Sequence, residues 1–158
     1  MSIASAIFMV RPAAFGYNPE TSASNEFQQK ENSASGNDLQ MHAVKEFDAF
    51  VNKLKEHKIN VTVFQDSELP VKPDAIFPNN WLATMPDGQL IIFPMEAANR
   101  RIERSESIIQ FFKENYFVHS FLDLSENESQ QKFLEGTGSI IMDHANKKMY
   151  ACISSRTN

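Results

Sequence analysis

The stretch WLATMPDGQLIIF, residues 81–93, has the turn sequence Pro86-Asp87-Gly88 between two apolar runs. Pro and Asp favour turns and Gly tolerates positive φ, so this pattern predicts a β-hairpin with buried strands. Apolar residues then recur at helical spacing over residues 96–114, and residues 116–121 predict a further buried strand. Hairpin, helix and strand together predict one α/β module.

A similar succession precedes this module. Residues 3–10 predict a buried strand that stops at Arg11-Pro12, because Pro cannot donate to the sheet ladder. The polar segment 18–37 predicts an ordered functional loop or a mobile lid with an exposed tip. Apolar residues at three- and four-residue spacing predict a helix over residues 38–57, and a strand follows at residues 59–63.

A third succession begins after residue 139. Residues 140–142 and 149–153 are apolar and flank the polar segment 144–148, which predicts another hairpin, and no helix follows it. We therefore expect an α/β fold of about two and a half ββαβ-type modules, forming one truncated domain over residues 1–158. An ordinary α/β sandwich is the alternative.

Composition excludes several classes of function. The formal charge is -5 and the fifteen Lys and Arg are scattered, so we expect no nucleic-acid partner. No apolar run approaches the roughly 20 residues needed to cross a bilayer, so we expect no membrane partner. Cys152 is the one cysteine, which rules out an internal disulfide and favours a reducing compartment. We expect a cytoplasmic protein.

Three segments combine Gly, Pro or Asn with a charged residue beside an apolar strand. They are PDAIFPNNW at residues 73–81, LEGTGS at residues 134–139 and SSRTN at residues 154–158. At a strand end, a binding site can use a polar group without burying it in the core. The alternative is that Asp74, Asn79 and Asn80 are turn residues that satisfy their own backbone.

Together the three segments resemble the guanidino-group-modifying superfamily of dimethylarginine dimethylaminohydrolases, arginine deiminases and amidinotransferases. The resemblance is strongest to the branch with Phe-Pro-Asn-Asn-Trp and Glu-Gly-Thr-Gly-Ser, which includes citrulline hydrolases. Arg11-Pro12, Phe15-Gly16, Asn18 and the RRIE of residues 100–103 extend it. The resemblance implies a five-bladed α/β propeller, the pentein fold, with this chain as its N-terminal half.

The resemblance also implies site residues, position by position. Glu135 matches the carboxylate that hydrogen-bonds the guanidino nitrogens, and Asp74 matches the acidic residue of the first motif, both facing a central cavity. Arg100 and Arg156 match arginines that hold the substrate carboxylate, a role suited to the planar guanidinium fork. The alternative for Arg100 is a solvated helix residue. The implied catalytic residues are Asp74 and Glu135, and the implied substrate-binding residues are Phe77, Asn79, Asn80, Arg100 and Arg156.

Asn80 departs from most deiminase-type relatives, which have Asp at this position. An ionised Asp only accepts hydrogen bonds and repels the oxygen of a neutral ureido group, whereas Asn can both donate and accept. Asn80 therefore favours a ureido substrate such as citrulline over arginine. Asn79 takes this role instead if the alignment is shifted by one residue.

In members of the family the nucleophile is a cysteine near the C-terminus, and a histidine is the general acid/base. Neither residue has a match in this chain. Cys152 lies in an apolar segment, so we expect a buried, unreactive thiol. The four histidines, His42, His57, His119 and His144, are expected to be structural or solvated. The resemblance implies no metal and no organic cofactor.

The resemblance implies a hydrolase of the ureido or guanidino C–N bond that acts through a cysteine covalent intermediate, with the nucleophile beyond this chain. Citrulline would give ornithine, ammonia and carbon dioxide, and arginine would give citrulline and ammonia. The partner is then a small arginine- or citrulline-like molecule, and a homo-oligomer is a further possible partner. The alternatives are an amidinotransferase and a non-catalytic half-propeller that binds a partner. This chain alone is expected to be inactive.

Overall fold

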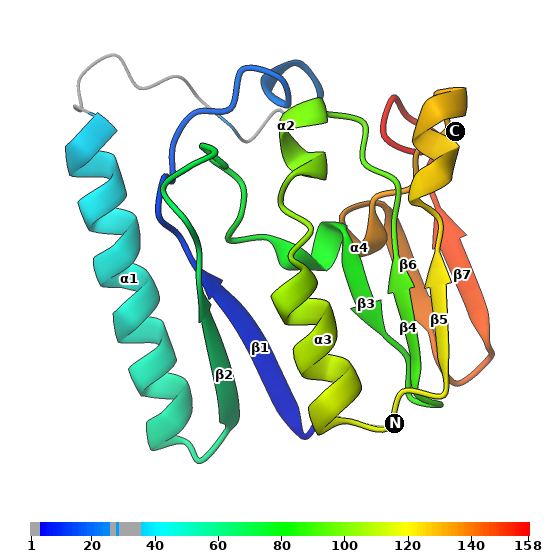
Figure 1. Cartoon of the computed structure of the whole chain (residues 1–158), viewed down its shortest axis with the longest axis horizontal. Helices are drawn as coiled ribbons and strands as arrows, with labels where there is room; N and C mark the ends of the chain where they lie inside the picture. The colour runs from blue at the N-terminus through cyan, green and yellow to red at the C-terminus, as the bar shows by residue number, and fades with distance from the viewer. Residues whose placement is uncertain (1–3, 26–27, 29–35) are drawn as a thin grey trace. The chain divides into compact units, whose positions relative to one another are not determined.

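The computed structural model describes residues 4–25, 28 and 36–158 (Figure 1). These residues form two compact units that divide between Phe77 and Pro78, called here the N-terminal and C-terminal units. Each is described by itself. Of the helices in the described ranges, none has the length and apolarity to span a bilayer.

The N-terminal unit is built on two parallel strands. Strand β1 (Ala6–Arg11) pairs in register with β2 (Asn60–Gln65). Parallel strands need a crossover connection, which helix α1 (Gly36–Glu56) supplies. Phe47 and Val51 are the buried residues of α1, on the apolar face that the spacing predicts. The strand, helix and strand predicted here are confirmed, but the first strand is not buried as predicted, since Val10 is the one buried residue of β1. Helix α1 begins two residues earlier than predicted.

The polar segment 18–37 lies partly outside the described residues, and so does its predicted tip. Its described part contains a short 3-10 helix, η1 (Ser22–Ser24). Asn18 and Thr21 are buried, at 0% and 3% exposure. This part of the segment is therefore packed and not only a solvated loop.

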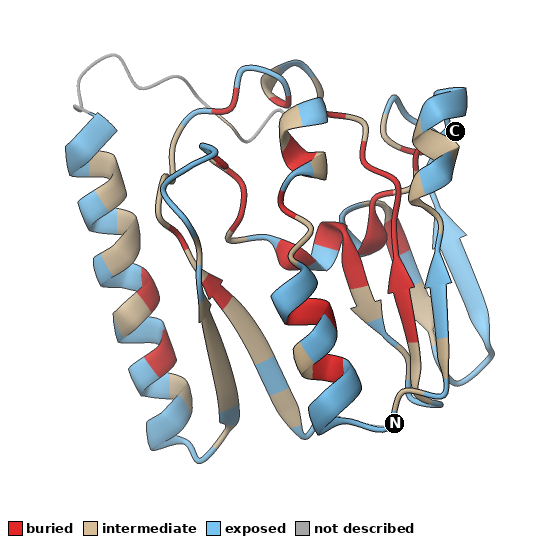
Figure 2. Cartoon of the chain, viewed as in Figure 1, coloured by how far each residue is buried: buried red, intermediate tan, exposed pale blue. Residues whose placement is uncertain are grey.

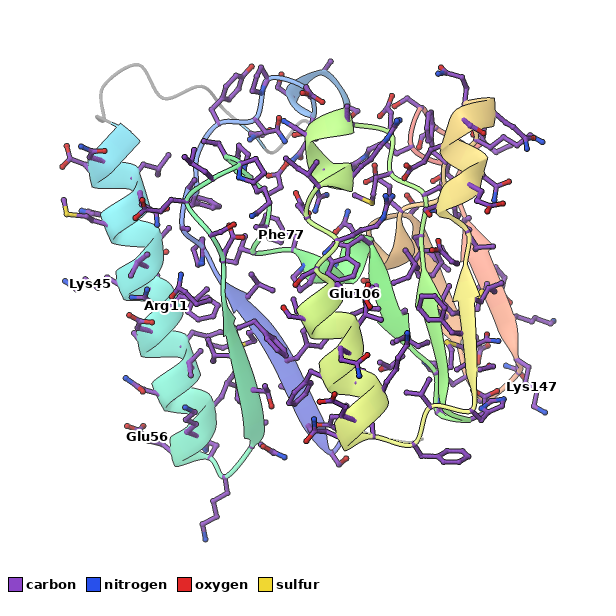
Figure 3. The ribbon with its side chains drawn as sticks, in the orientation of Figure 1. Arg11, Lys45, Glu56, Phe77, Glu106 and Lys147 are labelled. Carbon is purple, nitrogen blue, oxygen red and sulfur yellow. The ribbon has the colours of Figure 1, made fainter. Side chains whose placement is uncertain are left out.

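Arg11 joins the end of β1 to α1. Its Nε and Nη2 donate to Asp48 Oδ1 and Oδ2, both at 2.8 Å, and its Nη1 donates to Gln65 Oε1 at 3.1 Å. Figure 3 labels Arg11 beside α1. The hydrogen bonds from Arg11 hold the pKa of the Asp48 carboxyl below its ordinary value. Arg11, part of the family resemblance, thus has a structural role in the N-terminal unit.

This pair makes stability depend on acid pH. Since the folded pKa of Asp48 is lowered, its contribution is present above the unfolded pKa of about 4 and is lost as pH falls through the folded value. We expect Asp48→Asn to lower the free energy of unfolding by less than about 1 kcal/mol near neutral pH, because the pair is partly exposed. Urea unfolding of both proteins should show that difference shrinking towards about pH 2.5. A difference that does not change with pH contradicts this, and Glu46→Gln is the control on the same helix.

The C-terminal unit begins with the predicted hairpin. Strands β3 (Leu82–Thr84) and β4 (Gln89–Ile92) are antiparallel, and β5 (Ser120–Asp123) joins β4 in parallel, in the order β3-β4-β5. Burial is highest along this hairpin (Figure 2), where the least exposed residues include Trp81, Leu82, Leu90, Ile92, Phe93 and Met95. Burying a side chain of this size stabilises by roughly 1.5–3 kcal/mol.

Two predictions in this unit are wrong. The single helix over residues 96–114 is two helices, α2 (Ala98–Arg101) and α3 (Glu106–Asn115), because Ser105 starts a new helix by accepting from the Ile108 N–H. The buried strand over residues 116–121 is also displaced. Strand β5 begins only at Ser120, opposite the first residue of β4, and is mostly exposed.

The last part of the chain forms the second predicted hairpin. A 3-10 helix, η3 (Ser125–Gln130), and a one-turn helix, α4 (Gly136–Ser139), lead into the antiparallel strands β6 (Ile140–Asp143) and β7 (Lys148–Ala151). Ile140 packs with Ile91 and Phe93 in one core cluster. The other face is uncovered within the described chain, and every residue of β7 is exposed (Figure 2).

This exposure overturns the prediction for Cys152, which lies just after β7 and is exposed. The apolar pattern correctly predicted the hairpin, but burial also needs an element to cover it.

We expect the 158-residue chain to self-associate through the β6–β7 hairpin, because Ile141, Tyr150 and Ile153 are 75%, 54% and 88% exposed. Sedimentation at tens of micromolar should give more than the monomer mass, with binding of an apolar dye. Ile141→Lys should shift the chain towards monomer, while Lys147→Gln in the same hairpin should not. A wild-type monomer that binds no dye contradicts this expectation.

Candidate active site

Glu135 is the centre of the candidate site in the C-terminal unit. It immediately precedes α4 and is 0% exposed. Its Oε1 accepts from the Glu96 N–H at 3.2 Å, and its Oε2 accepts from Asn80 Nδ2 at 3.3 Å. A buried carboxylate needs such donors, since burial without them costs several kcal/mol. Both oxygens therefore have assigned partners.

Two guanidinium groups face the same oxygen. Arg156 Nη1 lies 3.4 Å from Glu135 Oε2, and Arg100 Nη1 lies 3.9 Å from it. The Arg156 side chain is 21% exposed, whereas that of Arg100 is 3% exposed. The two cations offset the cost of burying the carboxylate. The alternative that Arg100 is solvated is wrong.

Arg100 is fixed by a second carboxylate. Its Nε and Nη2 donate to the two oxygens of Glu103, both at 3.0 Å, and Glu103 is as deeply buried as Arg100. This bidentate pair spans the end of α2, which helps to explain why the chain turns there. Glu103 belongs to the RRIE motif, but no role was predicted for it.

Two short helical turns, one at Asn80 and one just after Glu135, bring these two residues together. Asn79 and Asn80 lie in a 3-10 helix, η2 (Pro78–Asn80), and Asn79 Nδ2 donates to Thr137 Oγ1 at 2.8 Å. Gly136 has a φ of +27°, and a Cβ there would lie 2.2 Å from the Asn79 carbonyl oxygen. Only glycine allows this close approach of η2 and α4.

The last residues hold Arg156 in place. Thr157 bridges to Leu134, and the Asn158 N–H donates to the Phe133 carbonyl at 3.2 Å. The Phe133 N–H donates back to Asn158 Oδ1 at 2.8 Å. These contacts hold residues 156–158 beside residues 133–135, and so hold Arg156 near Glu135.

Glu96 also belongs to the site, and the sequence did not single it out. Arg101 Nε and Nη2 donate to the carbonyls of Met95 and Glu96, at 2.9 and 2.8 Å, which holds the Glu96 backbone beside Glu135. Ser155 Oγ donates to Glu96 Oε2 at 3.2 Å. Its place just beyond the end of β4 was the signal that could have pointed to it.

Asp74 lies in the N-terminal unit and is buried, at 8% exposure. Its Oδ2 accepts from Asn18 Nδ2 at 2.7 Å and from Thr21 Oγ1 at 3.2 Å. Asn18, which extended the family resemblance, is thus a direct partner of Asp74. The hydrogen bonds fix the orientation of this carboxylate.

Phe77 is the remaining predicted site residue and is 46% exposed. It is labelled in Figure 3 and lines an apolar groove of about 640 Å³ in the N-terminal unit. Phe15, His42, Phe47 and Phe50 line the same groove.

The four histidines are exposed, in agreement with solvated roles. Among the residues that the structure describes, no three His, Cys, Asp or Glu side chains are grouped to hold a metal ion.

Solved structures share this fold. The N-terminal domain of ArgZ bound to substrate, an arginine dihydrolase from cyanobacteria, matches 96% of this chain and 49% of its own, at 18% identity and a TM-score of 0.63. A dimethylarginine dimethylaminohydrolase adduct with S-methyl-L-thiocitrulline matches 96% of this chain and 52% of its own, at 16% identity and a TM-score of 0.61. The chain spans 17% of full-length ArgZ and about half of these two structures.

These likenesses confirm the predicted α/β fold of the pentein type. No curated protein matches the chain in sequence. The family model described as N,N dimethylarginine dimethylhydrolase, eukaryotic, matches residues 11–158, and the chain therefore belongs to this guanidino-modifying family.

Proposed function

We propose that the whole protein hydrolyses the C–N bond of a ureido or guanidino group on an arginine-related amino acid, with citrulline preferred. This chain supplies the substrate-binding part, as the N-terminal portion of a longer catalytic domain. In the C-terminal unit, Glu135 and Asn80 orient the reacting group, and Asn79, Arg100 and Arg156 bind the substrate. In the N-terminal unit, Asp74 and Phe77 have the catalytic and substrate-binding roles that the family resemblance implies.

The observation that carries the proposal is the buried Glu135 carboxylate. It is wholly inaccessible, yet its contacts are nitrogen donors, an amide from Asn80 and two guanidinium groups. A carboxylate in such a place accepts N–H groups in a fixed orientation, which is what a guanidino or ureido group offers. The arginine dihydrolase and dimethylarginine dimethylaminohydrolase structures of the same fold support a substrate of this class.

The reaction has two steps. A cysteine thiolate outside this chain attacks the central carbon of the substrate, an S–C bond forms, and the C–N bond to the leaving nitrogen breaks as that nitrogen takes a proton and departs as ammonia. Water then adds to the same carbon and releases the thiolate, with a histidine outside this chain moving the proton. From arginine this step gives citrulline; from citrulline it gives the carbamate of ornithine, which breaks its remaining C–N bond and releases carbon dioxide and ornithine. Glu135 holds the group in position for both attacks.

Asn80 favours the ureido group. Its Nδ2 has two N–H groups and donates one of them to Glu135, so the amide can donate the other to a ureido oxygen and accept from a ureido N–H through Oδ1. A carboxylate in its place would put a second anion 3.3 Å from Glu135, which suits only a cationic guanidinium.

The arginines hold the amino-acid carboxylate. Arg156 is the accessible one, and it exchanges its contact with Glu135 for the ligand when the ligand enters. Arg100 donates from Nε and Nη2 to Glu103 and lies 3.9 Å from Glu135, so it serves mainly to neutralise the buried carboxylates beside the ligand.

Ammonia release by the purified whole protein, with citrulline and arginine as competing substrates, tests the proposal. We expect turnover of both with citrulline preferred, no turnover by the 158-residue chain, and no loss in Cys152→Ser. No turnover of either substrate, or turnover that depends on Cys152, contradicts the proposal. Transfer of the amidino group to an added amine would indicate an amidinotransferase.

A further inference from the structure

We infer that Gly138 determines substrate specificity by positioning the Asn80 amide. The sequence predicted no role for Gly138. This inference rests on the proposed function, in which Asn80 recognises the ureido group. Gly138 touches no reacting atom and acts through Asn80 alone.

The contact is a close one. A Cβ at position 138 would lie 2.4 Å from Asn80 Nδ2 and 3.0 Å from Asn80 Cγ, and its third nearest atom would be Asn80 Oδ1 at 3.4 Å. All three atoms belong to the side-chain amide. Asn80 is 7% exposed, so the amide has little room to move away from such a group.

Gly136 provides the contrast within the same turn. There a Cβ would meet backbone, the Asn79 and Asn80 carbonyl oxygens at 2.2 and 2.9 Å, and φ is +27°. Glycine at 136 is required for the fold of η2 against α4. Glycine at 138 is required instead for the position of the Asn80 side chain.

Asn80 Nδ2, the atom nearest to a Cβ at position 138, is also the atom that contacts Glu135. Asn80 Nδ2 donates to Glu135 Oε2 at 3.3 Å, so a methyl group at 138 would displace the amide from the carboxylate it is paired with. A neutral ureido ligand would lose a positioned donor and acceptor. A guanidinium ligand keeps its main partner, Glu135, and so loses less.

The test is Gly138→Ala in the whole protein, alone and combined with Asn80→Ala. In the Asn80 background, the citrulline-to-arginine ratio of kcat/KM should fall by roughly three- to tenfold, the value of one neutral hydrogen bond. With Asn80→Ala present, there is no amide to displace, and Gly138→Ala should change the ratio by less than about twofold. Gly36→Ala is the control, since a Cβ there meets no atom within 4 Å.

An equal change in both backgrounds, or none in either, overturns the inference. A second measurement does not depend on turnover: the side-chain amide resonances of Asn80, assigned by their loss in Asn80→Ala, should shift in Gly138→Ala and not in Gly36→Ala. Unmoved resonances show that Gly138 does not position Asn80, even if the enzyme is active. A wild type that turns over neither substrate contradicts the proposed function, and the specificity role falls with it.

Discussion

Replacing Asn80 by Asp should shift the relative kcat/KM of the whole protein from citrulline towards arginine by about ten- to hundredfold, since a hydrogen bond to a charged group is worth roughly 1.5–3 kcal/mol. The new carboxylate would face Glu135, whose Oε2 is 3.3 Å from Asn80 Nδ2. A carboxylate cannot donate to that oxygen or to a ureido oxygen, and a guanidinium placed between the two anions would relieve their repulsion.

The measurement is a competition assay of both substrates on both proteins, with circular dichroism to show that the fold is kept. Asn79→Asp is the matched control, because the Asn79 amide donates to Thr137 and not to Glu135. A larger shift in Asn79→Asp than in Asn80→Asp would give Asn79 the discriminating role. If the ratio stays within about twofold in Asn80→Asp, this side chain does not recognise the ureido group.

Glu135→Gln should lower kcat/KM by at least about tenfold, through loss of charge-assisted contacts worth roughly 1.5–3 kcal/mol. Gln is nearly the same size and can still accept from the Glu96 N–H, so the main change is the charge. Since Arg156 and Arg100 lie 3.4 and 3.9 Å from this carboxylate, some loss of stability is also expected. Thermal unfolding of the variant should still show one cooperative transition well above the assay temperature.

Glu103→Gln separates the two effects. It weakens the hold on Arg100 without changing the group that contacts the substrate, so it should cost stability with a smaller loss of kcat/KM. Unaltered kinetics in a folded Glu135→Gln protein would make Glu135 a structural residue. Equal kinetic losses in both variants would mean that Glu135 acts only through Arg100.

Much of the fold could be predicted because its signals are local. The turn Pro86-Asp87-Gly88 between two apolar runs is enough to specify the β3–β4 hairpin, and Gly88 has the positive φ, +90°, that such turns need. The spacing of apolar residues likewise predicted α1. These patterns depend on few long-range contacts.

The wrong predictions depended on partners distant in sequence or absent from the chain. Ile102 and Ile109 kept the apolar spacing on both sides of the break, but the buried pair of Arg100 and Glu103 and the cap at Ser105 divide the helix there. Cys152 fits the apolar pattern but is exposed, because no described element covers strand β7, which it follows. Glu96 was missed because its contact with Glu135 uses a backbone N–H, which any residue carries.

The bridge between Leu134 and Thr157 couples ligand binding to the C-terminal end of the chain. Each bridged residue is a chain neighbour of one charged partner, Glu135 on one side and Arg156 on the other. A ligand that binds both charges therefore stabilises the bridge, and by thermodynamic linkage anything that strengthens the bridge favours the ligand equally. Asn158, which contacts Phe133 and none of the charged groups, becomes a remote position from which affinity can be tuned.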